Sequence, residues 1–132
     1  MNYHLEILDK SISYRGFFRI ERYRLRHEQF AGGWSAEMTR ECLERGHAVA
    51  VLLYDPTSDQ VVLLEQFRIG ALEFPGGPWL LEIVAGIIDC FGETTEEVAR
   101  RETAEEASCE LLDLIPIYRY LVSPGGTSES IT

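Results

Sequence analysis

Cysteine and basic residues are scarce in this sequence. The three cysteines, Cys42, Cys90 and Cys109, are odd in number and match no zinc-binding spacing, so they predict neither a disulfide framework nor a zinc site. They are typical of reduced thiols in a cytosolic protein, and we therefore expect a cytoplasmic location. Twelve Lys and Arg residues against 22 Asp and Glu residues give a formal net charge of −10. This balance argues against non-specific nucleic-acid binding, which requires a basic surface.

Long apolar runs and targeting patterns are also missing. No run approaches the ~20 apolar residues that span a membrane, and the start, MNYHLEILDKS, lacks a basic-then-apolar signal pattern. We therefore expect no membrane partner. The hydrophobic fraction of 45% over 132 residues suits one globular domain with a small appendage. The acidic charge still permits a phosphorylated substrate, because local Arg residues or a metal can reverse the potential in a cleft.

The first 43 residues are rich in β-strand patterns. Residues 3 to 30 predict strands, and the partial alternation from Tyr14 to Arg26 suggests a break or bulge near Glu21 and Arg22. A turn at 31–33 precedes a further strand, predicted from Trp34 to Cys42. Strands this few and short cannot bury a core alone. We therefore expect residues 1–43 to form a small antiparallel β domain that leans on another domain or subunit.

Residues 44–132 predict a larger second domain. The apolar run from Ala48 to Tyr54 is typical of a central buried strand. One helix, at 94–107, would cover one face of the sheet, and no second amphipathic helix is evident for the other face. We therefore expect the chain to be a fragment, or to be completed by a partner chain. Further strands are predicted at 60–67, 79–85 and 114–122, with turns or loops at 55–59, 71–78 and 123–127.

The predicted helix carries a cluster of carboxylates. Thr94 is a good N-cap, and Glu97 three residues later completes a capping box. Glu102, Glu105 and Glu106 stand at i, i+3 and i+4, which places them on one helical face. Their mutual repulsion lowers stability unless it is offset, and a hard divalent cation such as Mg²⁺ or Mn²⁺ would offset it. The alternative interpretation is a solvated acidic face.

The residues around this helix resemble the Nudix box, G-x5-E-x7-R-E-U-x-E-E-x-G-U, in which U is aliphatic. The resemblance is specific, because it fixes many residue types at fixed spacing over more than twenty positions. The metal-binding carboxylates of the pattern are all present. The matching residues are Gly86, Glu93, Arg101, Glu102, Glu105 and Glu106.

The sequence departs from the Nudix pattern at four points. Six residues instead of five separate Gly86 from Glu93, so the loop is one residue longer. Thr103 and Cys109 occupy aliphatic positions, and Ser108 stands where the family has glycine. A residue with a side chain is costly there if the backbone must be left-handed. These differences concern the loop geometry and the helix end.

Nearly the whole chain is similar to the ADP-ribose pyrophosphatases of this family, through the segments YRGFF, ERGHA, EQFRI, PWLLE and SPGGTSE. Pro124 stands fifteen residues beyond Cys109, as a Pro does in those enzymes. The resemblance implies an α+β fold, an α/β/α sandwich with a mixed sheet, preceded by a small β domain that swaps across a homodimer. It implies Mg²⁺-dependent hydrolysis of ADP-ribose to AMP and ribose 5-phosphate, with Mn²⁺ as a possible replacement. The alternatives are hydrolysis of another nucleoside diphosphate sugar such as GDP-mannose, or a truncated, non-catalytic module that binds a nucleotide or metal.

The resemblance also implies roles for individual residues. The metal ligands would be Glu102, Glu106 and the carbonyl of Ala85, with Glu105 beside them. Glu93 and Arg101 would form an internal ion pair. The general base of similar enzymes lies beyond residue 132, and Glu129 comes too early to match it, so Glu105 is the base candidate within the chain. Without the resemblance, the two Phe residues would be core residues and the Arg and Glu residues surface residues. The substrate contacts would be Phe17, Phe18, Arg40, Arg68, Glu82, Ile87, Ser123, Pro124 and Gly125.

Overall fold

The structure is a computed structural model that describes residues 3–89 and 92–132. The chain divides into two compact units, Met1–Gly46 with Leu121–Glu129, and His47–Tyr120 with Ser130–Thr132. The predicted α+β class is confirmed, because antiparallel and mixed sheets accompany one α-helix within the described residues. The expected domain boundary between residues 43 and 44 stays a prediction.

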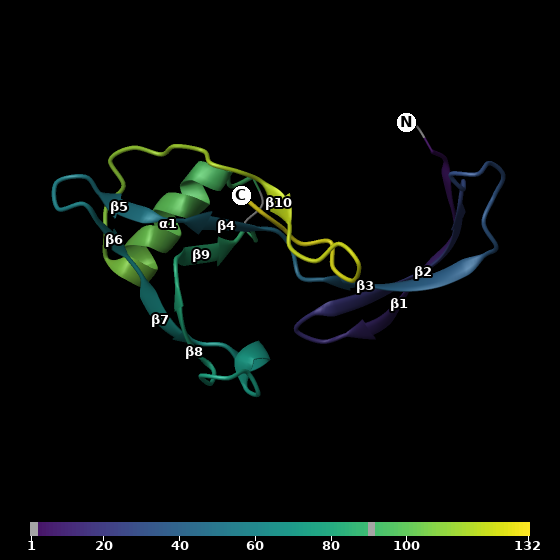
Figure 1. Ribbon diagram of the computed structural model, residues 1–132, viewed down its shortest axis with the longest axis horizontal. Helices are drawn as coiled ribbons and strands as arrows, with labels where there is room; N and C mark the ends of the chain where they lie inside the picture. Colours follow the sequence, from purple (N-terminus) through teal and green to yellow (C-terminus); the bar gives the residue numbers. More distant parts are fainter. Residues whose placement is uncertain (1–2, 90–91) are drawn as a thin grey trace. The chain divides into compact units, whose positions relative to one another are not determined.

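The first unit contains a three-stranded antiparallel sheet (Figure 1). Its strands run in the order β1-β2-β3, and both pairings are antiparallel. The segment from Tyr14 to Arg26, for which the sequence predicted strands, contains the turn of the β1–β2 hairpin at 16–18, where a Cβ on Gly16 would overlap the Tyr14 ring. The strand predicted from Trp34 begins only at residue 38, and Trp34 itself makes an isolated bridge to Glu28. The bounds are β1 (Leu5–Arg15), β2 (Arg19–His27) and β3 (Met38–Glu44).

The break or bulge predicted near Glu21 and Arg22 does not lie within β2 itself, but one irregularity of the β1–β2 ladder lies opposite Glu21, which pairs with Ile12. Both residues lie within β2 in regular register with β3, and the two irregularities of the β1–β2 ladder lie between Ile7 and Asp9 and between Ile12 and Tyr14. Glu21 is buried although it is charged. Charged partners on neighbouring residues satisfy its carboxylate, so the polar residue does not interrupt the strand.

Glu21 is the buried carboxylate of this sheet. It accepts a hydrogen bond from the Tyr23 hydroxyl at 2.5 Å and lies 2.8 Å from Lys10 Nζ and 3.0 Å from Arg19 Nη2. The hydrogen bonds from Lys10 and then Tyr23 lower the pKa of Glu21, and the bond to Glu21 raises the pKa of Lys10. The group therefore stays ionised inside the small β unit.

The second unit contains strands of a mixed sheet in the order β11-β4-β9. β11 runs parallel to β4, with Ile131 opposite Ala48, and β4 runs antiparallel to β9, with Ala50 opposite Ala85. This agrees with the mixed sheet that the sequence predicted. The bounds are β4 (Ala48–Val51), β9 (Val84–Ile87), β10 (Tyr120–Leu121) and β11 (Ser130–Ile131).

The long strands predicted in this unit are each divided in two. Breaks occur at Leu52, Leu63 and Ile83, where one partner strand gives way to another. The strand predicted at 114–122 is wrong except at β10, since Pro116 lacks an N–H for a ladder and the neighbouring apolar side chains are exposed. The resulting ladders pair β5 (Leu53–Asp55) with β6 (Gln60–Val62), and β7 (Leu64–Phe67) with β8 (Trp79–Glu82). A short 3-10 helix, η1 (Ile69–Ala71), follows β7.

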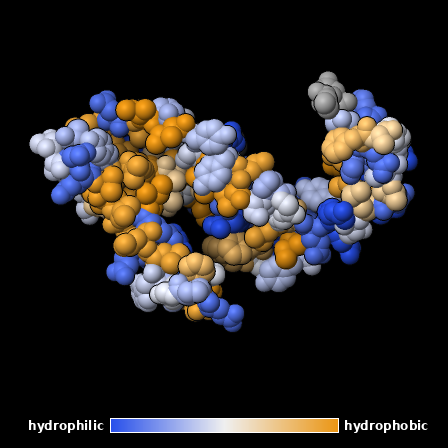
Figure 2. Space-filling model, viewed as in Figure 1, coloured by the Kyte–Doolittle hydropathy of each residue, from blue (hydrophilic) through white to orange (hydrophobic). Residues whose placement is uncertain are grey.

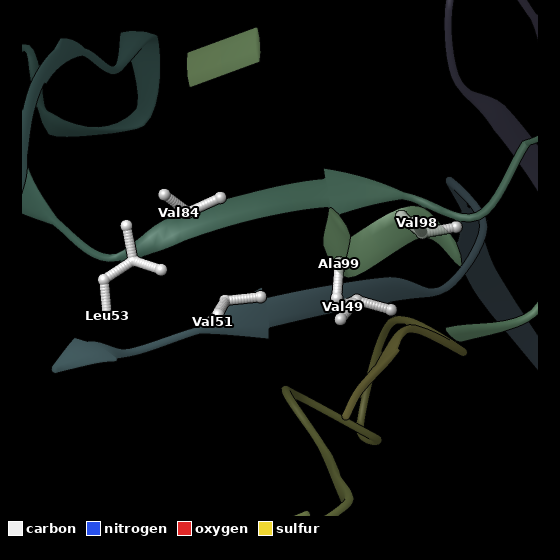
Figure 3. Close-up of a cluster of buried hydrophobic side chains, with 6 residues drawn as sticks. All are labelled: Val49, Val51, Leu53, Val84, Val98 and Ala99. Carbon is white, nitrogen blue, oxygen red and sulfur yellow. The ribbon is translucent and has the colours of Figure 1, made fainter. Parts of the chain in front are cut away.

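The helix α1 (Thr95–Ala107) packs against β4 and β9, and their buried side chains form the core (Figure 3). Alternate residues of a strand point to one face, which gathers the β4 and β5 side chains beneath the helix. The predicted capping box is confirmed: Thr94 Oγ1 accepts from the Glu97 N–H, and the Glu97 carboxylate accepts from the Thr94 N–H at 2.8 Å. The core residues are Val49, Val51, Leu53, Val84, Val98 and Ala99.

Within the described residues, no helix has the length and apolar character needed to cross a membrane.

Candidate metal and diphosphate site

Strand β9 passes close beneath α1 at Gly86. A Cβ atom on this residue would overlap the carboxyl group of Glu102. The backbone of Gly86 is not left-handed, so glycine is required here for space and not for its torsion angle. The absent side chain therefore lets a carboxylate of the helix lie directly against the strand.

Arg101 connects the loop before the helix to the carboxylate face. Its Nε and Nη2 donate to the two oxygens of Glu93 at 3.0 and 3.2 Å, which is a bidentate ion pair. Its Nη1 donates to Glu102 Oε1 at 2.6 Å and lies 3.7 Å from Glu105 Oε2. These bonds, that to Glu93 first, raise the pKa of Arg101. The structure thus contains the ion pair that the resemblance implied.

Glu106 lies between two strands. Its Oε1 accepts from Gln66 Nε2 on β7 at 3.0 Å, and its Oε2 accepts from the Ala85 N–H on β9 at 3.2 Å. The N–H and C=O of a residue in an antiparallel strand point to the same edge, so the Ala85 carbonyl also faces this edge of β9. Sequence reasoning missed Gln66. Its position two residues before Arg68 places both side chains on one strand face, and this spacing could have drawn attention to it.

The carboxylate face suits a hard divalent cation in its chemistry. Within residues 3–89 and 92–132, no three His, Cys, Asp or Glu side chains converge as a ready metal cluster. Glu102 is turned toward Arg101, Glu106 toward Gln66 and Ala85, and the Glu105 side chain is 61% exposed. An ionised carboxylate has about four acceptor positions, so these bonds leave lone pairs for a metal. The donor set, all oxygen, is the one that Mg²⁺ and Mn²⁺ prefer.

Arg68 and Glu82 form a close ion pair on the β7–β8 hairpin. Arg68 Nε lies 3.0 and 2.9 Å from the two oxygens of Glu82, and its Nη2 donates to Oε2 at 2.6 Å. The hydrogen bond to Glu82, and then the charges of Glu82 and Glu106, raise the pKa of Arg68. The contact uses Nε and Nη2, so Nη1 lies outside it. Arg68 also lines a shallow cavity of about 380 Å³ with Gly70, Ala71, Phe74 and Leu80.

Three of the predicted substrate residues lie in the first unit, two of them in the β1–β2 turn and one on β3. Phe17 is 92% exposed at the β1–β2 turn and contacts Phe18 edge to face, with ring centroids 4.9 Å apart. Arg45 stacks on the Phe18 ring at 5.5 Å. Arg40 is exposed on β3 and donates to the Thr39 carbonyl at 2.8 Å. The side chains of Phe17, Phe18 and Arg40 are therefore exposed within the first unit, whereas core side chains would be buried.

The predicted turn at 123–127 is confirmed in the first unit. The Ser123 carbonyl accepts from the N–H groups of Gly126 and Thr127, both at 3.0 Å. This turn contains Pro124 and Gly125, two of the expected substrate contacts. The nearby Glu129 is buried and lies 3.4 Å from Arg45 Nε. It is a buried, paired carboxylate, and the sequence interpretation likewise gave it no catalytic role.

The positions that depart from the Nudix box have distinct surroundings. Thr103 is fully buried, and its hydroxyl has no hydrogen-bond partner among the described residues. Ser108 ends the helix in the left-handed region, with φ 52°. Cys109 packs against the core. Ile87, which does not depart from the pattern and is a predicted substrate contact, is half-buried on β9. Cys90 and Phe91 of the longer loop lie outside the described residues.

Several known proteins are similar to this chain. The ADP-ribose pyrophosphatase of Escherichia coli K12 is 50% identical to this chain over 125 residues. That of Haemophilus influenzae is 45% identical to it over 130 residues. The GDP-mannose pyrophosphatase of Yersinia enterocolitica is 29% identical over 133 residues, covering 99% of this chain and 68% of that protein. The chain spans 59% of the length of the two ADP-ribose pyrophosphatases, which match 95% and 96% of it.

The fold and the family follow from two further comparisons. A crystal structure described as an ADP compounds hydrolase matches with a TM-score of 0.74 at 24% identity, covering 96% of this chain and 63% of that chain. This likeness supports the fold alone. Residues 44–130, well over half of the chain, match the NUDIX domain. The resemblance of the Gly86–Cys109 segment is thereby confirmed, and the chain belongs to the NUDIX domain family.

Proposed function

We propose that this chain takes part in divalent-metal-dependent hydrolysis of the diphosphate of ADP-ribose, giving AMP and ribose 5-phosphate. The observation that carries the proposal is the carboxylate face of α1, which lies against β9 at Gly86 and is tied to the preceding loop by Arg101 and Glu93. The names of the relatives that are 50% and 45% identical support ADP-ribose as the substrate.

Glu102, Glu106 and the Ala85 carbonyl are the groups that would hold Mg²⁺ or Mn²⁺. A bound cation would neutralise the diphosphate and lower the pKa of an attacking water. The chain itself positions these donors: Arg101 hydrogen-bonds Glu102, and the Ala85 N–H hydrogen-bonds Glu106. In this proposal the Glu93–Arg101 pair acts as a brace between the loop and the helix.

Arg68 is the group in the second unit that would bind a substrate phosphate. Its bidentate contact with Glu82 fixes the guanidinium orientation before the substrate arrives. The Nη1 group outside this contact is available to a phosphate oxygen. From the family resemblance we also assign substrate contacts in the second unit to Glu82 and Ile87. The corresponding assignments in the first unit are Phe17, Phe18, Arg40, Ser123, Pro124 and Gly125.

Glu105 is the general base that we propose within the described residues. It shares the helical face of Glu102 and Glu106, and its exposed side chain can reach a water molecule. Removing a general base typically lowers the rate by a factor of about 10²–10⁴. A Glu105→Gln variant should therefore lose turnover while it keeps metal binding. Turnover equal to that of the wild-type protein would place the base elsewhere.

The test is AMP release from ADP-ribose by the protein in its full encoded length, with Mg²⁺ and with chelator. We expect turnover that requires the metal and that falls to background in Glu106→Gln. GDP-mannose is the second candidate substrate, favoured by the Yersinia relative that is 29% identical. Faster turnover of GDP-mannose than of ADP-ribose would support that candidate. Nucleotide binding without turnover of either substrate would instead indicate a non-catalytic module.

We also propose that the protein is a homodimer whose first unit contributes to the interface. Exposed apolar side chains of β1, including Leu5, Ile7 and Tyr14, support this assignment.

For location we propose the cytoplasm, since Cys42 and Cys109 are free in the structure and burial raises the pKa of the Cys42 thiol. The net charge of −10 supports a small-molecule substrate in place of nucleic acid.

A further inference from the structure

The β7–β8 hairpin presents two different faces. The half-buried face carries Gln66 and Glu82 together with Leu64 and Leu80, and Arg68 follows directly after β7. The other face carries Phe67 and Trp79, a cross-strand pair whose rings meet edge to face at 5.7 Å and are partly exposed. Figure 2 shows hydrophobic surface in the region of this hairpin. Gln66 and Glu82 are therefore polar residues on the half-buried face of the hairpin, beside Leu64 and Leu80, and their presence there needs its own explanation.

Gln66 meets the helix through a hydrogen bond from its Nε2 to Glu106 Oε1 at 3.0 Å. The second oxygen of this carboxylate accepts from the Ala85 N–H at 3.2 Å. Each oxygen of Glu106 is thus held by a different strand, and the two bonds together restrict the rotation of the carboxyl group. Without Gln66, the repulsion from Glu102 and Glu105 on the same helical face would favour turning Glu106 away.

The choice of an amide donor has an electrostatic consequence. A Lys or Arg at position 66 would neutralise the Glu106 carboxylate and compete with a bound cation. The Gln66 amide orients the carboxylate without adding a positive charge to its surroundings. The contrast with Glu102, which faces the Arg101 guanidinium at 2.6 Å, makes Glu106 the carboxylate with the stronger remaining attraction for a cation.

We infer that Gln66 is a positioning residue, which orients Glu106 toward a divalent cation and sets it relative to Arg68, which follows β7. The inference rests on the proposed function, because it presumes that Glu106 is a metal ligand. Outer groups that orient metal ligands typically change metal affinity by a factor of about 10–100 when they are removed. Gln66→Ala should therefore bind Mn²⁺ at least about tenfold more weakly than the wild-type protein.

The experiment is a Mn²⁺ titration of the substrate-free protein in its full encoded length, followed by electron paramagnetic resonance of the free ion. The variants are Gln66→Ala, Gln66→Asn and Glu106→Gln. Gln66→Asn retains the amide but shortens the side chain, so it should also lose affinity. Gln60→Ala is the matched control, because Gln60 is an exposed glutamine on the neighbouring strand β6. It should bind Mn²⁺ like the wild-type protein.

The outcomes separate this inference from the proposed function. Weaker binding in both Gln66 variants and in Glu106→Gln, with unchanged binding in Gln60→Ala, supports both. Wild-type affinity in either Gln66 variant, with weakened Glu106→Gln, overturns the positioning role alone. Wild-type affinity in Glu106→Gln overturns the metal site itself. If Gln66→Ala does not fold, as judged by near-ultraviolet circular dichroism, the more conservative Gln66→Asn decides. An equal loss in Gln60→Ala would also overturn the inference, since the effect would not be specific to position 66.

Discussion

At the scale of single residues, Thr103 offers a direct test of packing. Its hydroxyl is buried without a hydrogen-bond partner among the described residues, at a position where the Nudix box has an aliphatic side chain. A buried, unsatisfied hydroxyl costs about 1–3 kcal/mol. Thr103→Val replaces the hydroxyl by a methyl group of similar shape, so we expect the free energy of unfolding to rise by about 1 kcal/mol. Urea denaturation measures this change.

A matched control for Thr103 lies in the first turn of the same helix. Thr95 is exposed, so Thr95→Val should change the free energy of unfolding by no more than about 0.5 kcal/mol. A stability in Thr103→Val that is equal to or lower than that of the wild-type protein would contradict the prediction. It would mean that the hydroxyl contributes a favourable contact.

The sequence could predict the local contacts of the candidate site, but not the long-range ones. The helical period of 3.6 residues places Glu102, Glu105 and Glu106 on one face without any knowledge of the fold. The contact of Glu106 with Gln66 joins residues that are 40 positions apart. It depends on how β7 lies against α1, and no local pattern encodes that arrangement.

At the scale of elements, the start of α1 depends on its capping box. Thr94→Ala removes the side-chain acceptor for the Glu97 N–H, and we expect a loss of about 1 kcal/mol in the free energy of unfolding. Bonds from the Thr94 backbone and hydroxyl lower the pKa of Glu97. A lowered pKa in the folded state stabilises the protein above the unfolded-state pKa of about 4.3, and this contribution is lost as the pH falls through the folded-state pKa.

The difference in stability between the wild-type protein and Thr94→Ala should therefore shrink in acid. Thermal unfolding at pH 7 and near pH 3 would show it, because the variant lacks the Thr94 hydroxyl bond to the Glu97 carboxylate. A difference that is the same at both values of pH would show that the ionised Glu97 adds nothing to the cap.

The residue that ends α1, Ser108, has a strained backbone conformation. Ser108 has φ 52°, a left-handed conformation that glycine adopts without the steric cost of a Cβ atom. Ser108→Gly should raise the free energy of unfolding by about 0.5–1 kcal/mol, after allowing for the greater freedom of glycine in the unfolded chain. Ser108→Val should lower it by about 1 kcal/mol, since a β-branched residue disfavours this conformation. Chemical denaturation in which Gly and Val have equal effects would contradict this explanation.

The strands show where periodicity stops being informative. The buried strand predicted from the apolar run at 48–54 is confirmed for β4, but Leu52 and Tyr54 are exposed. The structure divides the run at Leu52, where β4 pairs with β9 and β5 pairs with β6. An apolar pattern records which face is buried, not which strand is the partner. The helix boundaries were easier to predict, because the cap residues and the left-handed Ser108 are local features.

At the scale of the whole molecule, the acidic balance constrains how a diphosphate could be held. With a net charge of −10, the overall electrostatic potential of the protein repels a negatively charged diphosphate. Binding must therefore depend on local positive groups. In the second unit, Arg68 and Arg101 are already paired with Glu82 and Glu93. The pairs fix the two guanidinium groups but offset their charge. A divalent cation on the α1 face would supply the missing positive charge, and we therefore expect substrate affinity to depend on the metal.

The proposed homodimer gives the last prediction. Leu5 and Ile7 stand two residues apart on one face of β1, and the Ile7 side chain is 53% exposed. Exposed aliphatic side chains in a row are typical of an interface. Ile7→Glu would place an unpaired charge there, which costs several kcal/mol on burial, so we expect the dimer to dissociate at micromolar concentration. Light scattering after size exclusion measures the mass of the full-length protein and its variants.

Val61→Glu is the control for the dimer prediction. Val61 is an aliphatic residue on a strand of the second unit, 49% exposed, and its replacement should leave the dimer intact because it lies outside the proposed interface. A monomeric wild-type protein would contradict the dimer altogether. A dimer that persists in Ile7→Glu but dissociates in Val61→Glu would move the interface to the second unit. Since β1 lies in the unit that carries Phe17, Phe18 and Arg40, loss of the dimer in Ile7→Glu together with weaker substrate binding would tie assembly to these proposed contacts.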